Sequence, residues 1–232
     1  MIKAVFFDLY GTLARFQPPR EEVQAQACQH FGFQVARGGL VLGYAVADEW
    51  MAKINASRRP LPGMSREERD RFFAEYERLV LLGAGIKVDL QTAGKVWARV
   101  REIPYGLALF DDVLPTMDTL KRRGLILGTL SNITEDLQKL SRNLGLTTYL
   151  DFAINSWEVG IGKPHPPIFL AALECAGVLA SEALMVGDSY RSDVQGALGV
   201  GIRPLLLDRE DVLTGIEECP KIRALPEVMG YL

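Results

Sequence analysis

The sequence predicts an α/β protein whose core is a five-stranded parallel sheet, with a block of helices inserted after the first strand. Residues 2–7 form an apolar run broken only by Lys3, which is typical of a strand covered on both faces. Residues 20–103 carry helical patterns without a convincing strand. After Pro104, helices and strands alternate, as the crossover connections of a parallel sheet require.

The composition is that of a globular protein. Apolar residues make up 48% of the 232 residues and charged residues 24%, enough for one large or two modest cores. The net charge of -3 lacks the basic excess of nucleic-acid-binding proteins. Three widely spaced cysteines fit neither a disulfide framework nor a zinc site and favour a reducing compartment. No leader-like segment is visible and no apolar run approaches about 18 residues, so we expect a cytoplasmic protein without membrane or nucleic-acid partners.

The first strand ends in a carboxylate, Asp8, followed closely by Gly11. Ligands of open α/β sheets bind at the carboxyl ends of the strands, and a glycine lets the main chain turn sharply there. Taken alone, Asp8 fits equally well as the cap of an ordinary turn, because Asp often accepts main-chain hydrogen bonds in turns.

The helical block begins after a hinge-like segment, residues 15–19, whose two prolines are not expected to continue a regular element. The helices predicted in this block cover residues 21–31, 40–54, 65–82 and 89–103. Ser65 and Glu68 have the spacing of a capping box, Asp89 suits an N-cap, and residues 58–63 form a loop. We expect the block to be a separate lobe.

The remainder of the chain alternates helices with strands. Helices are predicted at residues 113–123, 135–144, 166–176 and 192–198, and strands at residues 125–130, 152–155, 183–186 and 203–207. Thr134 is the expected N-cap of one helix, and Gly124 and Gly145 are expected to end two of them. The tail after Asp208 predicts no more than a short terminal helix.

Polar side chains gather where these strands end. Ser131 and Asn132 follow one strand, Asp188 follows another with Asp193 five residues later, and Lys163 lies between them. Each has an ordinary role when considered alone, as a helix cap, a turn residue or a solvated lysine. In a parallel sheet they share one edge with Asp8. Two carboxylates at one edge repel each other unless a cation separates them, and Mg²⁺ suits carboxylates together with phosphate oxygens. The convergence predicts a phosphoryl-binding site.

Four motifs in order resemble those of the haloacid dehalogenase-like (HAD) hydrolase superfamily. They are residues 7–13 (FDLYGTL), 130–132 (LSN), 163–169 (KPHPPIF) and 187–193 (GDSYRSD). The resemblance covers nearly the whole chain. The helical block between the first two motifs is similar to the cap of the subfamily that includes the dehalogenases and many small-molecule phosphatases.

The resemblance implies a Rossmann-like catalytic core, residues 1–14 and 107–232, and a helical cap domain, residues 15–106. It also implies a role for each matching residue. Asp8 would be the nucleophile, with Tyr10, Ser131 and Lys163 completing the catalytic set; Asp8, Asp188 and the main-chain carbonyl of Tyr10 would hold Mg²⁺; Ser131, Asn132 and Lys163 would bind the substrate's phosphoryl oxygens; Thr12 and Asp193 would support these groups.

One position departs from the pattern of the phosphatases. They usually carry a second Asp two residues after the nucleophile, as general acid and base, and this chain has Tyr10 there. Loss of such a group typically costs about 10²- to 10⁴-fold in rate, and tyrosine, with an ordinary pKa of about 10, is a poor base at pH 7. We expect a Mg²⁺-dependent phosphatase of a small phosphorylated metabolite that works through an aspartyl-phosphate, with reduced efficiency.

Two alternatives stay open. Tyr10 resembles the metal-independent 2-haloacid dehalogenases, although these typically carry Ser-Ser-Asn where this chain has Val186, Gly187 and Asp188. A weakly catalytic member that acts as a binding or scaffold protein is the third reading. The sequence leaves the substrate undefined and is compatible with a monomer or a homodimer.

Overall fold

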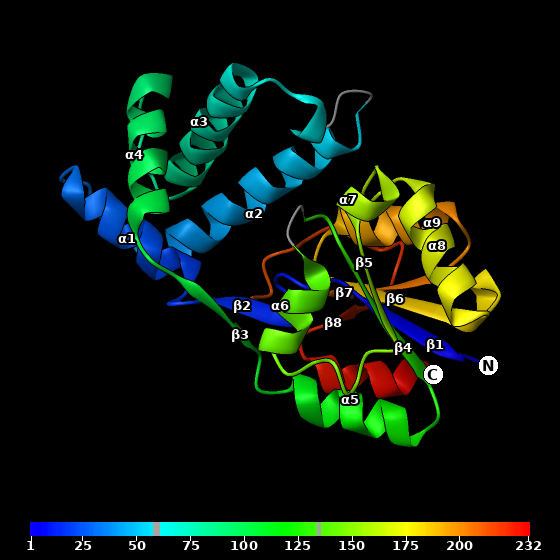
Figure 1. Ribbon diagram of the computed structural model, residues 1–232. Coiled ribbons are helices and arrows are strands. Elements are labelled where there is room, and N and C mark those ends of the chain that lie inside the picture. Colours follow the sequence, from blue (N-terminus) through cyan, green and yellow to red (C-terminus); the bar gives the residue numbers. More distant parts are fainter. Residues whose placement is uncertain (58–60, 134–135) are drawn as a thin grey trace. The chain divides into compact units, whose positions relative to one another are not determined.

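The computed structural model describes residues 1–57, 61–133 and 136–232 (Figure 1). Two compact units make up this part of the chain. One comprises residues 1–15 and 108–232, and the other residues 16–107. Part of the loop expected at residues 58–63, together with the expected N-cap Thr134 and the first residue of its helix, lies outside the described residues.

The first unit contains a six-stranded sheet in the order β5-β4-β1-β6-β7-β8, with every neighbouring pair parallel. The strands are β1 (Ala4–Phe7), β4 (Ile126–Ser131), β5 (Phe152–Asn155), β6 (Ala183–Gly187), β7 (Arg203–Leu207) and β8 (Lys221–Ile222). The predicted α/β class with a parallel sheet is confirmed, but the predicted count of five strands is wrong. The sixth strand, β8, has only two residues, too few to produce a strand pattern in the sequence.

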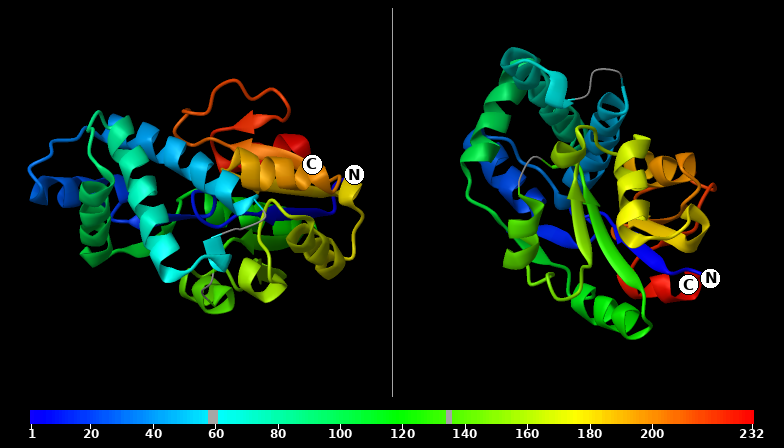
Figure 2. Two further views of the ribbon diagram at one scale, coloured as in Figure 1. Left: turned by 90° about the horizontal axis from the view of Figure 1, so that it is seen from above. Right: turned by 45° about the vertical axis from the view of Figure 1, so that its right-hand side comes forward.

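Successive side chains of β1 point to opposite faces of the sheet, and both faces are covered. Val5 and Phe7 belong to an apolar cluster with α5 (Val113–Arg122), α6 (Leu137–Asn143) and the 3-10 helix η4 (Leu225–Tyr231). Ala4 and Phe6 belong to a second cluster with α8 (Pro166–Ala176) and α9 (Gly196–Gly199). Figure 2 shows the yellow helix α8 on the opposite side of the sheet from green α5 and red η4. The sheet is therefore buried on both faces, as the apolar run predicts.

Helix boundaries depart from the prediction within the fourth motif and just after it. The predicted helix 192–198 is replaced by a π-helical segment, η3 (Tyr190–Gln195), which continues into α9. Short helices α7 (Ser156–Val159) and η2 (Ala180–Glu182) follow β5 and precede β6. The helix after β4 begins with Asp136 as its N-cap, whose side chain accepts from Lys139 N at 2.9 Å.

The second unit is helical. Its elements are α1 (Arg20–His30), α2 (Arg37–Asn55), η1 (Leu61–Gly63), α3 (Arg66–Gly83) and α4 (Leu90–Glu102). The capping box of Ser65 and Glu68 and the N-cap Asp89 are confirmed. Helices α2 and α3 approach so closely that a Cβ on Gly43 would lie 2.1 Å from the Val80 carbonyl oxygen. None of the helices described is long and apolar enough to span a membrane.

The chain passes between the units within two short strands that pair with each other, β2 (Ala14–Gln17) and β3 (Gly106–Leu109). Three residues of the hinge-like segment 15–19 belong to β2, but its two prolines lie outside the strand, as expected. Pro18 and Pro19 follow the last residue of β2, so neither ring removes a donor from the strand.

Candidate active site

Asp8 follows β1 directly, between β4 and β6, at the carboxyl edge of the sheet. Its main-chain N–H donates to the Val186 carbonyl at 2.9 Å, and the residue is 8% exposed. The chain then turns at Gly11, which has φ +80° and donates to the Ala14 carbonyl at 2.8 Å. This left-handed conformation favours glycine. The turn holds a carboxylate at the strand end in a nearly water-free position.

Lys163 joins two of the predicted carboxylates. Its Nζ lies 2.5 Å from Asp8 Oδ1 and 2.6 Å from Asp193 Oδ1, and the lysine is 2% exposed. The second oxygen of Asp193 accepts from Ser189 N at 3.0 Å. A buried ammonium group is thus shared by two carboxylates from the first and fourth motifs.

Burial and charge act against each other in this cluster. Burial raises the pKa of Asp8 to about 6, with the nearby Asp193 adding to the rise and Lys163 opposing it. Burial lowers the pKa of Lys163, but its pairs with Asp193 and Asp8 more than offset this, so the pKa is raised overall. Lys163 therefore stays protonated at neutral pH and offers a permanent positive charge beside Asp8.

Asn132 fixes the main chain of Lys163. Its side-chain oxygen accepts from Lys163 N at 2.7 Å, and its amide nitrogen donates to the Lys163 carbonyl at 2.8 Å. Gly162 lies against this amide, since a Cβ there would come within 2.2 Å of Asn132 Oδ1. Asn132 of the second motif thereby fixes the main chain at Lys163, the first residue of the third motif.

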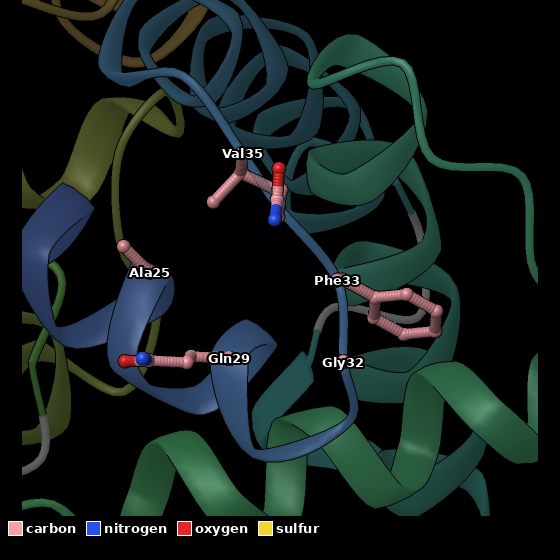
Figure 3. Close-up of a pocket in the computed structure, with 6 residues that line it drawn as sticks. Ala25, Gln29, Gly32, Phe33 and Val35 are labelled. Carbon is pink, nitrogen blue, oxygen red and sulfur yellow. The ribbon is translucent and has the colours of Figure 1, made fainter.

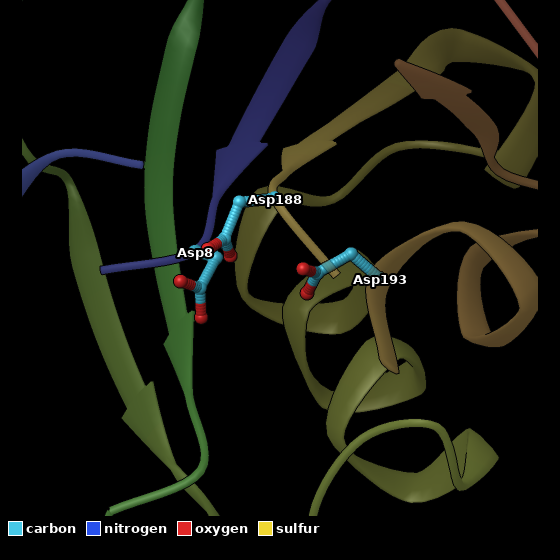
Figure 4. Close-up of side chains that lie close together, drawn as sticks. All are labelled: Asp8, Asp188 and Asp193. Atoms are coloured by element: carbon cyan, nitrogen blue, oxygen red, sulfur yellow. The ribbon is translucent and has the colours of Figure 1, made fainter. Parts of the chain in front are cut away.

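Three carboxylates form a group that could hold a cation. Oxygens of Asp8, Asp188 and Asp193 lie within 4.8 Å of one another, with Asp188 the most exposed (Figure 4). A Cβ on Gly11 would lie 2.1 Å from Asp188 Oδ2, so the first turn packs directly on this carboxylate. Carboxylate oxygens suit Mg²⁺. Since Lys163 already pairs with one oxygen of Asp8 and one of Asp193, the second oxygen of Asp8 and the carboxylate of Asp188 fit the ion best.

The other predicted residues have different surroundings. Ser131 is buried at the end of β4, in register with Asn155 of β5. Tyr10 is half-buried and packs against the apolar cluster on the α5 face of the sheet. Thr12 is fully buried, and its hydroxyl has no hydrogen-bond partner within the described ranges.

Arg209 is a neighbour of the site that the sequence did not indicate. Its Nη2 donates to the Thr12 carbonyl at 2.9 Å across a separation of 197 residues. No motif contains it, and an arginine just after a strand carries no signal of such a contact.

A cavity of about 340 Å³ lies elsewhere, on the helical unit. Its lining residues are Ala25, Gln29, Gly32, Phe33, Gln34 and Val35 (Figure 3). They carry no ionisable side chain, and none belongs to the predicted site. This cavity offers no group for acid-base or nucleophilic chemistry.

A doubly covered parallel sheet, a carboxylate after its first strand and a buried lysine from a later loop fit a hydrolase of the haloacid dehalogenase type. The family model of the haloacid dehalogenase-like hydrolases matches residues 2–201. The chain belongs to this family, and the resemblance inferred from the four motifs is confirmed.

Relatives with assigned activities include two phosphatases. Ribulose-1,5-bisphosphate 5-phosphatase of Halopiger xanaduensis is 31% identical over 216 residues, which cover 90% of this chain and 85% of that protein. Phosphoserine phosphatase of Thermus thermophilus is 37% identical over 128 residues, 52% of this chain and 51% of that protein.

Solved structures of both chemistries share the fold. A HAD phosphatase of Thermococcus onnurineus has a TM-score of 0.58 and 24% identity, covering 99% of this chain and 97% of that one. A 2-haloacid dehalogenase of Pseudomonas syringae has a TM-score of 0.57 and 25% identity, covering 99% and 97%. The fold alone therefore does not separate phosphate ester hydrolysis from dehalogenation.

Proposed function

We propose that this hydrolase is a Mg²⁺-dependent phosphatase of a small phosphorylated metabolite, with Asp8 as nucleophile. The observation that carries the proposal is the buried cluster in which Lys163 pairs with Asp8 and Asp193 while Asp188 lies alongside. A dianionic phosphate needs such positive charge next to an anionic nucleophile. The phosphatases among the relatives support the same reaction class.

In the proposed reaction, an oxygen of Asp8 attacks phosphorus, the bond between phosphorus and the ester oxygen breaks, and the leaving oxygen takes up a proton from solvent, which the attacking water of the second step returns. Water then attacks the aspartyl-phosphate, which releases inorganic phosphate and restores Asp8. Lys163 keeps its proton and, with Ser131, holds the phosphoryl oxygens. Mg²⁺, held by Asp8, Asp188 and the Tyr10 carbonyl, would supply the remaining positive charge.

The helical unit, residues 16–107, is proposed to act as the cap that selects the substrate. Its position in the chain, between the first and second motifs, supports this role. Closure of such a unit excludes water and brings specificity groups to the substrate. The substrate itself is defined here only by its chemistry, a small phosphate monoester.

The proposal is tested by phosphate release from p-nitrophenyl phosphate with Mg²⁺ and with EDTA. We expect turnover that needs Mg²⁺ and falls by about 10³-fold or more in Asp8→Asn, because the nucleophile is lost. Asp118→Asn, an exposed carboxylate on α5, is the matched control and should retain full activity. Turnover that survives Asp8→Asn would contradict the assignment of the nucleophile.

A second candidate is the metal-independent 2-haloacid dehalogenase, favoured by Tyr10 and by the 25% identity to a dehalogenase of known structure. Here Asp8 would attack carbon and displace halide. Chloride release from 2-chloropropionate, equal with Mg²⁺ and EDTA, would establish this reaction instead. If neither product forms, also in Tyr10→Asp, a binding or scaffold role becomes the better account.

A further inference from the structure

Arg209 holds together three distant segments of the core unit. It follows β7, and its Nη1 and Nη2 donate to the two oxygens of Asp112 at 2.9 and 3.0 Å. The same Nη2 donates to the Thr12 carbonyl at 2.9 Å. The guanidinium carbon lies 3.9 Å from the centre of the Phe110 ring. Asp112 also accepts from Leu225 N at 2.9 Å.

These contacts are largely shielded from water. The side chains of Arg209 and Asp112 are only 15% and 21% exposed. A bidentate pair between guanidinium and carboxylate fixes both groups in one plane, and stacking on an aromatic ring restricts the plane further. The hydrogen bond to Thr12 is therefore made by a donor whose direction is already set.

The main chain that carries Arg209 is also held in place. The preceding residue, Asp208, is 3% exposed and accepts from Val212 N at 3.1 Å, Leu213 N at 2.9 Å and Lys221 Nζ at 3.1 Å. Its own N–H donates to the Ile222 carbonyl at 2.8 Å. Arg209 is thus presented from a rigid C-terminal loop that lies beyond the part of the chain matched by the family model.

The segment that Arg209 holds is the turn of the candidate active site. Thr12 lies four residues after Asp8 and two after Tyr10, whose carbonyl is the proposed metal ligand. Gly11, between them, packs against Asp188. A shift of the Thr12 peptide would therefore move both the nucleophile's turn and its contact with the fourth motif.

We propose that Arg209 is a positioning residue of the active site, which fixes the turn after Asp8 through the Thr12 carbonyl while Asp112 and Phe110 fix Arg209 itself. This inference rests on the proposed function, because it assigns Arg209 to the geometry of that same metal and nucleophile site. Arg209 touches neither substrate nor metal in this role.

The test compares Arg209→Met and Arg209→Lys with the wild-type protein in two measurements. The first is kcat and KM for p-nitrophenyl phosphate at saturating Mg²⁺. The second, independent of turnover, is the Mg²⁺ midpoint, defined as the apparent dissociation constant obtained by fitting the rise in Tm against the Mg²⁺ concentration, because an ion that binds the folded state stabilises it by an amount set by the ratio of its concentration to this constant. The kinetics are measured well below the Tm of each variant.

For Arg209→Met we expect kcat to fall about 10- to 100-fold, since small misplacements of reacting groups have effects of this size, with KM changed less than about twofold. The Mg²⁺ midpoint should rise about fivefold or more. Arg209→Lys keeps the charge but cannot make the bidentate pair, so its effects should be intermediate. If Arg209→Met fails to fold, Arg209→Lys alone decides the question by the same criteria.

Arg203 provides a matched control. It starts β7 at the opposite end of the strand and likewise donates to a main-chain carbonyl, that of Tyr231, at 3.2 Å. Arg203→Met and Arg203→Lys should leave kcat and the Mg²⁺ midpoint unchanged.

The outcomes separate this proposal from the proposed function. Arg209 variants with a lower Tm but wild-type kcat and Mg²⁺ midpoint would overturn it, because Arg209 would then be structural only. A wild-type protein whose Tm rises with Mg²⁺ but which does not hydrolyse p-nitrophenyl phosphate, together with a raised Mg²⁺ midpoint in Arg209→Met, would support the positioning role and overturn the proposed phosphatase function. A wild-type protein with neither response would overturn both.

Discussion

The surroundings of Asp8 disfavour the ionised form of its carboxyl group. Water is nearly excluded from it, a second carboxylate lies across the shared lysine, and its pKa is raised to about 6. A group that is costly to keep ionised in the folded state is typical of a functional site, where stability is sacrificed for chemistry. Lys163 limits this cost without removing it.

This environment predicts that the stability of the metal-free protein depends on the ionisation of Asp8. The folded-state pKa of Asp8 is raised from 3.8 to about 6. Its contribution to the free energy of unfolding is therefore fully present below about pH 4 and is lost as the pH rises through 6. Asp8→Asn should therefore be more stable than the wild-type protein at pH 8 in EDTA, by roughly 1–3 kcal/mol. Urea unfolding at pH 4.5 and 8 measures this.

In the same experiment, Asp118→Asn, an exposed carboxylate, should change stability little at either pH. A lower stability of Asp8→Asn at pH 8 would show that pairing with Lys163 outweighs burial.

Tyr10 stands where phosphatases of the family usually carry a second Asp, and it packs against the apolar cluster on the α5 face of the sheet. Tyr10→Asp should raise kcat for p-nitrophenyl phosphate by about tenfold or more, since a general acid-base group contributes about 10²- to 10⁴-fold and part of this is lost to imperfect placement. Steady-state kinetics with Mg²⁺ measure the gain. Tyr10→Asn places a side chain as large as Asp there but without an acid, so its kcat should not rise. An equal rise of kcat in both variants would mean that the smaller side chain, and not the acid, is the cause.

Among the elements, the loops at the sheet edge are packed through glycines. A Cβ would lie 2.1 Å from Asp188 at Gly11, 2.2 Å from Asn132 at Gly162 and 2.2 Å from Asp193 at Gly187. Each glycine thus makes room for a motif side chain: Gly11 of the first motif for Asp188 of the fourth, Gly162 for Asn132 of the second, and Gly187 for Asp193 within the fourth. The site side chains can lie this close to the neighbouring main chain because glycine has no Cβ.

Gly11→Ala is predicted to disrupt the candidate metal site. The new methyl group would overlap Asp188, in addition to the strain of a φ of +80°, so Asp188 must move. We expect the Mg²⁺-dependent rise in Tm to be abolished and kcat to fall about 100-fold. Melting curves with and without Mg²⁺ and steady-state rates measure these effects.

Gly124→Ala is the matched control for this change. Gly124 ends α5, has φ +76° and has open space around the position of a Cβ. Both substitutions carry a similar backbone strain of about 1 kcal/mol or more, but only Gly11→Ala should alter the response to Mg²⁺. Equal losses in both variants would assign the effect to strain.

In the whole molecule, each unit contains a buried carboxyl group whose pKa is raised. In the helical unit this is Glu77 of α3, which is 0% exposed and accepts from Gln24 Nε2 at 2.5 Å. Its second oxygen has no partner among the residues that the structure describes. Burial raises the pKa of Glu77 to about 7, partly opposed by Gln24.

The two groups predict that the metal-free protein loses stability from mildly acid to mildly alkaline pH. The contribution of Glu77 to the free energy of unfolding is present below about pH 4.5 and is lost as the pH rises through 7. Glu77→Gln should be more stable than the wild-type protein by roughly 1–3 kcal/mol at pH 8.5 and nearly equal at pH 5. Denaturant unfolding at both values measures this. Glu67→Gln, exposed on the same helix, should match the wild-type protein at each pH, and equal behaviour of both variants would contradict the prediction.

Much of the fold could be predicted because periodicity and capping are local properties. The apolar run of β1, the capping box at Ser65 and the N-cap Asp89 can each be recognised within one short window. The prediction missed elements that are too short to show a hydrophobic pattern, and elements that form by pairing with a segment distant in the chain. Strand β8 has two residues, and β2 forms only by pairing with β3, about 90 residues away in the chain.

The order of the motifs and the rule that parallel strands end at one edge were enough to gather Asp8, Lys163 and Asp188 into one site and to indicate the family. The folded chain was needed to show that one lysine pairs with both Asp8 and Asp193, that Asn132 holds the lysine's main chain, and that Arg209 reaches Thr12. The physical reason is that periodic patterns encode burial along one element. Contacts between loops have no period, and they depend on how separately folded segments pack.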